Sequence, residues 1–166
     1  MDIRIAGIVD DSIVDGPGFR LAVFTQGCPH DCPGCHNPDT HDFNGGKADT
    51  TEHIIQMMLA NPLLDGVTLT GGDPFCQCAA CAEIAKAAKA NTLNVWAYSG
   101  WTYEELAKMA EEDEDVAHLL ENTDVLVDGP FLLSQRTLEL RFRGSKNQRL
   151  IDVKQSLEKG CAVELQ

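Results

Sequence analysis

Short apolar segments alternate with helical patterns along most of this chain. Four of the apolar segments have the length of buried strands, at residues 19–25, 66–70, 94–99 and 124–128. Helical patterns lie between them, at residues 49–60, 80–90 and 102–110. Strands that alternate with helices are typical of βα units, so the sequence predicts an α/β fold with a mainly parallel sheet.

Two of the predicted helices begin with a capping-box pattern, in which an N-cap side chain is followed three residues later by a glutamate. Asp49 precedes Glu52 in the first helix, and Thr102 precedes Glu105 in the third. We therefore expect Asp49 and Thr102 to be the N-caps of these helices.

Glycine follows every predicted strand. The four positions after the strands are occupied by Gly27, Gly71 with Gly72, Gly100 and Gly129. In parallel α/β sheets the active site forms from the loops at the carboxyl ends of the strands. Glycine there lets the backbone approach a ligand closely. Any one of them could be an ordinary turn glycine, but together they predict a shared site at one edge of the sheet.

Length and charge limit the classes of function. The chain has 166 residues, which suits a single domain over residues 1–166. Its net charge of −13 argues against a nucleic-acid partner. No segment has the length and apolarity of a membrane span, and no signal-peptide pattern opens the sequence. We therefore expect a cytoplasmic protein with neither nucleic acid nor membrane as a partner.

The basic residues are unevenly placed. Seven of the 13 lysines and arginines fall in the last 31 positions. This basic segment could lie along the side of the molecule that meets a partner, or its charges could simply be solvated.

Three cysteines lie close together in the stretch GCPHDCPGC, and they are Cys28, Cys32 and Cys35. The chain has seven cysteines, an odd number that a closed disulfide framework cannot use completely. Close spacing in a cytoplasmic protein indicates metal binding or redox chemistry instead. An iron–sulfur cluster held by three thiolates would leave one iron open to another ligand. A zinc site would need a fourth ligand, and three nearby histidines could supply it: His30, His36 and His41.

Four further cysteines allow a second site. Cys76, Cys78 and Cys81 follow the second strand, and Cys161 could complete four ligands for an auxiliary cluster or zinc. However, Cys81 lies in an alanine-rich helical segment, where a small buried thiol packs well. Cys161 is remote in sequence. We favour a structural role for this group.

The spacing C-x3-C-x2-C after one strand, with a Gly-Gly-acid loop after the next, resembles the radical S-adenosylmethionine enzymes. Further motifs follow in a characteristic order: DGPGFR (15–20), GCPHDCPGCHNPDT (27–40), TGGDPF (70–75), VWAYSGWTYEEL (95–106), DVLVDGPF (124–131) and FRGSKNQRLIDV (142–153). Together they resemble the activating proteins of anaerobic ribonucleoside-triphosphate reductases over nearly the whole chain. The CHNPDT motif alone is also similar to pyruvate formate-lyase activating enzyme.

The resemblance implies a fold, two cofactors and a reaction. The fold is a partial, open (βα) barrel, in keeping with a chain far shorter than the about 250 residues of a complete eight-fold barrel. The cofactors are a [4Fe-4S] cluster and S-adenosyl-L-methionine, which binds the fourth iron. Such an oxidoreductase takes one electron from a low-potential donor such as flavodoxin or ferredoxin. It cleaves S-adenosylmethionine to a 5′-deoxyadenosyl radical, which forms a glycyl radical on the large subunit of the reductase.

The resemblance also implies roles for individual residues. Gly71, Gly72 and Asp73 match the Gly-Gly-Glu loop that holds the amino group of S-adenosylmethionine, with aspartate one methylene shorter than glutamate. Gly34 stands where many relatives place an aromatic residue, so its backbone is expected beside the adenine. His36 either borders the adenine or bonds to its own loop backbone. The cluster ligands are Cys28, Cys32 and Cys35, and no general acid or base is expected.

Two alternative functions stay open from the sequence. One is the activation of another glycyl-radical enzyme, such as pyruvate formate-lyase. The other is a non-catalytic iron–sulfur or zinc interaction module. A ferredoxin-like carrier would need a fourth thiolate near the first three, and residues 1–75 contain none.

Overall fold

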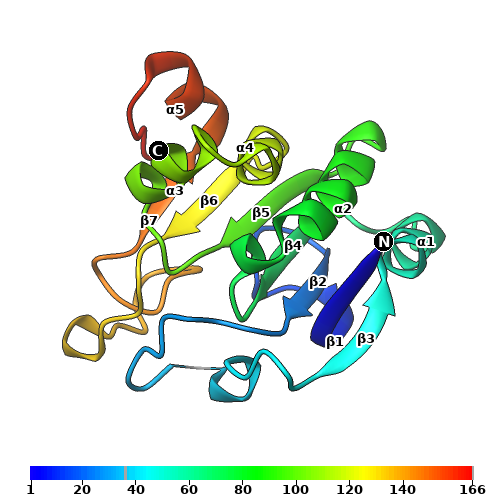
Figure 1. Cartoon of the computed structure of the whole chain (residues 1–166), viewed down its shortest axis with the longest axis horizontal. Helices are drawn as coiled ribbons and strands as arrows, with labels where there is room; N and C mark the ends of the chain where they lie inside the picture. Colours follow the sequence, from blue (N-terminus) through cyan, green and yellow to red (C-terminus); the bar gives the residue numbers. More distant parts are fainter. Residues whose placement is uncertain (36, 166) are drawn as a thin grey trace.

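The computed structural model describes residues 1–35 and 37–165. Within them, seven strands form one sheet in the order β3-β1-β2-β4-β5-β6-β7 (Figure 1). The strands are β1 (Asp2–Ser12), β2 (Arg20–Thr25), β3 (Lys47–Thr50), β4 (Gly66–Gly71), β5 (Asn94–Tyr98), β6 (Val125–Asp128) and β7 (Arg149–Asp152). The helices are α1 (Thr51–Ala60), α2 (Cys78–Ala90), α3 (Tyr103–Ala110), α4 (Glu114–Glu121) and α5 (Val153–Lys159). No helix in this part of the chain is both long and apolar enough to cross a membrane.

The four central strands are parallel, and they are the four that the sequence predicts. β2 pairs with β4, β4 with β5 and β5 with β6. The outer strands β1, β3 and β7 pair antiparallel. Within the described residues the sheet ends at β3 on one side and at β7 on the other. The sheet is therefore open, and the prediction of an open α/β fold built on parallel strands is confirmed.

All five helices pack on one face of the sheet (Figure 1). Alternate residues of the parallel strands, such as Leu21, Leu69 and Leu126, are fully buried beneath them. Each helix adds an apolar side chain to the same core: Ile54 (α1), Ile84 (α2), Leu106 (α3), Leu119 (α4) and Val153 (α5). Burial of this continuous apolar surface is the main stabilising contribution to the fold.

The opposite face of the sheet holds a smaller apolar cluster of Trp96, Val125 and Val127. Beside it lies Arg20, whose side chain is fully buried. The Arg20 guanidinium lies 5.8 Å from the centroid of the Trp96 ring. It donates hydrogen bonds to Thr68 Oγ1 at 2.7 Å and to the carbonyl oxygens of Pro17 at 2.9 Å, Val67 at 3.0 Å and Asn94 at 3.3 Å. Because the acceptors lie on β4, on β5 and before β2, one side chain joins three neighbouring strands.

One of the two predicted helix caps is confirmed and the other is wrong. Thr102 and Glu105 form the expected capping box at the start of α3. At α1 the N-cap is Thr50, whose side chain accepts a hydrogen bond from the N–H of His53 at 3.1 Å. Asp49 belongs instead to β3. Pairing of β3 with β1 extends the chain up to Thr50, so the helix begins one residue later than predicted.

Replacing Arg20 with methionine keeps an apolar stem and removes the guanidinium. We expect the free energy of unfolding to fall by about 2–4 kcal/mol, because the buried acceptors around it lose their donors. Urea denaturation measures this change. Arg136→Met is the matched control at an exposed arginine, and it should change the value by less than about 0.5 kcal/mol. Equal effects of the two substitutions would contradict the role assigned to Arg20.

Candidate functional site

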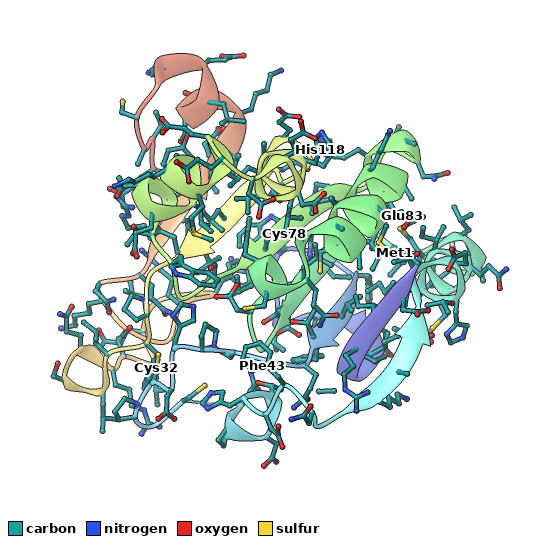
Figure 2. All side chains as sticks on the ribbon, in the orientation of Figure 1. Met1, Cys32, Phe43, Cys78, Glu83 and His118 are labelled. Carbon is teal, nitrogen blue, oxygen red and sulfur yellow. The ribbon has the colours of Figure 1, made fainter. Side chains whose placement is uncertain are left out.

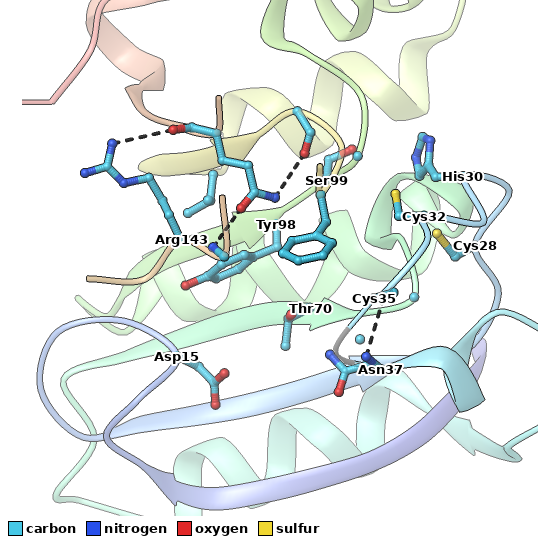
Figure 3. A pocket seen from close by; sticks show the side chains of 18 of the residues that line it. Asp15, Cys28, His30, Cys32, Cys35, Asn37, Thr70, Tyr98, Ser99 and Arg143 are labelled. Atoms are coloured by element: carbon cyan, nitrogen blue, oxygen red, sulfur yellow. Dashed lines mark hydrogen bonds between the residues drawn. The ribbon is translucent and has the colours of Figure 1, made fainter. Parts of the chain in front are cut away.

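A cavity of about 350 Å³ lies where the four parallel strands end (Figure 3). The loop after β2 contributes Cys28, Cys32 and Cys35, and the end of β4 with the loop after it contributes Gly71 and Gly72. The loops after β5 and β6 complete the wall with Ser99, Gly100, Gly129 and Phe131. The prediction that the glycine-marked strand ends converge on one site is therefore confirmed.

The three cysteines at this cavity each accept a backbone hydrogen bond. The donors are the His30 backbone for Cys28, the Phe131 backbone for Cys32 and, at 3.4 Å, the N–H of Asn37 for Cys35. Such N–H groups stabilise negative charge on sulfur and tune the potential of a cluster bound to it. The residues present therefore fit a cluster held by three thiolates.

Burial opposes the ionisation of these thiols. It raises the pKa of Cys28 to about 11 and also raises the pKa of Cys32. The negative charge of Asp73 acts in the same direction on both. Metal binding requires thiolates, so loading the site must displace protons, and a cationic group must offset the resulting charge.

The described residues can also be compared with the ligand set of a single metal ion. Among residues 1–35 and 37–165, no three His, Cys, Asp or Glu side chains are grouped so that they could hold one ion. The thiolates of a [4Fe-4S] cluster bind separate iron atoms, and for that reason they lie farther apart than the ligands of one zinc ion.

The loop after β4 lies directly on the loop that carries the cysteines. The N–H of Asp73 donates to the carbonyl oxygen of Gly27 at 2.8 Å, and the N–H of Gly72 donates to that of Thr25 at 2.8 Å. A Cβ atom on Gly72 would collide with the carbonyl of Gly27. Glycine is therefore required at position 72 for this close approach.

The Asp73 side chain is fully buried and is surrounded by hydrogen-bond donors. Its carboxylate accepts hydrogen bonds from Ser99 Oγ at 2.9 and 3.1 Å, from the N–H of Gly100 at 3.0 Å and from the N–H of Phe75 at 3.0 Å. The fourth partner is His30 Nε2, at 2.7 Å from the carboxylate. These partners come from the loops after β2, β4 and β5. The carboxylate thus holds three of the loops that line the cavity.

His30 is also fixed by its neighbours. Its ring packs edge-to-face against Trp101, with centroids 4.6 Å apart. A Cβ atom on Gly100 would collide with the His30 ring, so the glycine after β5 makes room for this contact. Figure 3 shows His30 beside Cys28 and Cys32 at one end of the cavity. The sequence suggested His30 as a zinc ligand, whereas its Nε2 faces Asp73.

The other residues that the sequence assigned to the site are Gly34, His36 and His41, and the structure describes two of them. Gly34 has a positive φ of 74°, and a Cβ there would lie 2.9 Å from the Leu133 side chain. The glycine thus lets the loop after β2 pack against the loop after β6. His41 lies at the cavity, together with Asn37. His36 lies outside the described residues.

Two further cavity residues, Tyr98 and Arg143, lie in motifs that the sequence analysis noted without giving either residue a role. Tyr98 lies on the cavity wall, and burial raises the pKa of its hydroxyl, so the phenol is neutral. Arg143 reaches the same wall from a loop 45 residues later, and its buried Nε has no hydrogen-bond partner among the described residues. Their shared location depends on tertiary contacts that residue spacing does not encode.

The members of the second cysteine group differ in burial. Cys78 and Cys81 are buried, Cys76 is half-buried and Cys161 is exposed. Cys78 donates to the carbonyl oxygen of Phe75 at 3.0 Å, and Cys81 packs in the main core. Figure 2 places Cys78 by α2, well apart from Cys32 among the loops. This packing supports a structural role for Cys78 and Cys81.

Comparisons with known proteins show which proteins this chain is similar to. Residues 14–151 match a family model described as "4Fe-4S single cluster domain". The anaerobic ribonucleoside-triphosphate reductase-activating protein of Vibrio cholerae is 34% identical over 146 residues, covering 82% of this chain and 89% of that protein. The pyruvate formate-lyase-activating enzyme of Clostridium pasteurianum is 38% identical over 114 residues, covering 63% of this chain and 48% of that protein. A crystal structure of QueE from Escherichia coli is similar with a TM-score of 0.45 and 15% identity, over 61% of this chain and 54% of that chain.

Asp73→Ala removes the carboxylate that joins the loops. We expect the free energy of unfolding to fall by about 3 kcal/mol, because several buried donors lose their acceptor. Urea denaturation followed by tryptophan fluorescence measures it, since Trp101 lies beside His30. Asp11→Ala, at an exposed aspartate, is the control and should have almost no effect. A small and equal effect of both changes would refute the role of Asp73.

Proposed function

The chain belongs to the family of anaerobic ribonucleoside-triphosphate reductase-activating proteins, among the radical S-adenosylmethionine enzymes, and on that basis we propose its reaction. It cleaves S-adenosylmethionine reductively and generates a glycyl radical on the large subunit of the reductase. Residues 1–166 act as one cytoplasmic domain, which receives its electron from a low-potential donor of the flavodoxin or ferredoxin type.

The observation that carries this proposal is the composition of one cavity. Three thiols with backbone donors share it with the Gly71-Gly72 backbone, at the carboxyl ends of parallel strands. When bound, a reduced [4Fe-4S] cluster supplies one electron to S-adenosylmethionine and so provides the 5′-deoxyadenosyl radical that takes a hydrogen atom from glycine. The protein's own task is to hold and orient the reactants and to keep water out.

We assign three kinds of role to the residues at the cavity. Cys28, Cys32 and Cys35 hold the cluster. The backbone of Gly71 and Gly72 faces the cavity and holds the amino group of S-adenosylmethionine. Asp73 belongs to the same loop, but with its carboxylate bound to four protein groups it acts mainly by keeping that loop in place. The Gly34 backbone and His36 are assigned to the adenine.

A second target is supported by one comparison. The similarity to a pyruvate formate-lyase-activating enzyme covers 63% of this chain. That relative is about twice as long as the matched region, since 48% of it is covered. The relatives named for the reductase match nearly their whole length, so the reductase is the proposed target.

The cluster assignment predicts iron content. Anaerobically reconstituted protein should hold about four irons per chain. Cys28→Ala, Cys32→Ala and Cys35→Ala should each reduce this to well under one, because the site then loses one of three protein ligands. Iron analysis and the visible absorption of the cluster measure the loss. Cys76→Ser and Cys161→Ala are the matched controls and should keep about four irons. A full cluster in any of the first three variants would overturn the assignment.

The proposed reaction predicts a radical on the partner. The reduced protein, mixed with S-adenosylmethionine and the large subunit of the reductase, should give an electron paramagnetic resonance doublet. The splitting arises from the α-hydrogen that stays on the glycine. The Cys32→Ala variant should give no doublet. A doublet with pyruvate formate-lyase and none with the reductase would establish the second target instead.

A further inference from the structure

The segment of residues 131–148, here called the basic rim, runs along the cavity. Phe131, Phe142 and Arg143 from this segment line the cavity wall. Leu133 lies against the loop after β2, at the position where a Cβ on Gly34 would meet it. The basic rim therefore borders both the cavity and the cysteine loop.

The basic rim is held in a defined conformation. The N–H of Leu132 donates to Ser145 Oγ at 3.2 Å, and Asn147 Nδ2 donates to the carbonyl oxygen of Pro130 at 2.8 Å. Arg136 and Ser145 form an antiparallel bridge. A surface ordered in this way can bind a partner with little loss of conformational entropy.

Apolar side chains are exposed along this segment. Leu138 is 85% exposed, Leu133 is 53% exposed and Leu132 is 37% exposed. Across the cavity, the loop before β2 exposes Ile13 at 65% and Val14 at 73%, and Val14 also lines the cavity. Apolar side chains thus stand on both sides of the opening. Exposed apolar groups that gather around a site are typical of a protein-binding surface.

Three exposed cations accompany the leucines: Arg136, Arg141 and Lys146. None of them forms an ion pair with a carboxylate in the described part of the chain, whereas Arg149 pairs with Asp128 and Glu104. Arg141 instead lies over the Phe142 ring, at 4.8 Å from its centroid. The chain as a whole has a net charge of −13, so a surface segment with three unpaired cations differs from the acidic character of the rest of the chain.

We propose that the basic rim is the docking surface for the protein whose glycine enters the cavity. The occupant is a surface patch of that partner which carries acidic and apolar side chains beside its glycine loop. This inference rests on the proposed function, because it assigns the contact that delivers the glycine. Complementary charge raises the rate of association and fixes the orientation of the complex. If the basic residues were merely solvated surface charges, the exposure of the cations would be explained, but the exposure of the leucines among them would not.

The test reverses the charges of the rim. The triple variant Arg136→Glu, Arg141→Glu, Lys146→Glu should bind the large subunit of the reductase at least about tenfold more weakly than the wild type, by biolayer interferometry. Raising the salt concentration should weaken the wild type and leave the variant little changed, since salt screens exposed charges. S-adenosylmethionine cleavage by the reduced variant without the partner should equal that of the wild type, which shows that its cavity is intact.

The matched control makes the same change in net charge on the helical face. It is the triple variant Lys86→Glu, Lys108→Glu, Lys154→Glu, whose lysines are exposed on α2, α3 and α5. This control should bind within about twofold of the wild type. Leu138→Ser tests the apolar part and should also weaken binding, without altering cleavage.

Three outcomes separate the claims. Weak binding and low radical yield in the rim variant alone support the docking surface. Equal affinity and equal salt dependence of the rim variant and the wild type overturn it, while the proposed function stands. A wild-type protein that cleaves S-adenosylmethionine but neither binds the reductase nor forms a radical on it overturns the proposed function and this surface with it.

Discussion

The buried carboxylate of Asp73 is the interaction on which the site depends. It contacts the cysteine loop through His30, its own loop through Phe75 and the loop after β5 through Ser99 and Gly100. A carboxylate removed from water is stable only when donors surround it. The three loops must therefore adopt this arrangement together, and the cavity forms as a consequence. The glycines nearby allow the loops to come this close.

The one-sided packing of the helices explains why the cavity is accessible. The main core lies between the helices and one face of the sheet. The other face carries only a small apolar cluster and the buried Arg20. Antiparallel strands end the sheet on both sides, so it does not continue into a closed barrel. A polypeptide loop can then approach the strand ends from the side that the helices leave uncovered.

The sequence predicts the centre of this structure better than its edges. The parallel strands are mainly apolar and most of their residues are buried. The cysteine spacing is local. Both features can therefore be read from adjacent residues. Five of the 11 residues of β1 are exposed and β3 is largely polar, so neither has a strong strand pattern. The pairing of β3 also moves the α1 cap from Asp49 to Thr50. Contacts such as His30 with Asp73 join residues 43 positions apart, and no local pattern encodes them.

The distribution of charge links the cavity to the surface around it. Burial is the largest cause of the raised pKa values of Cys28 and Cys32, and repulsion from Asp73 and from the neighbouring thiolates adds to it. The protein alone is therefore most stable with neutral thiols, and bound iron supplies the positive charge that ionised thiols need. The chain has a net charge of −13, whereas the basic rim contains four cationic side chains and a single carboxylate, Glu139. The acidic partner proposed above would be attracted to this rim, which borders the cavity.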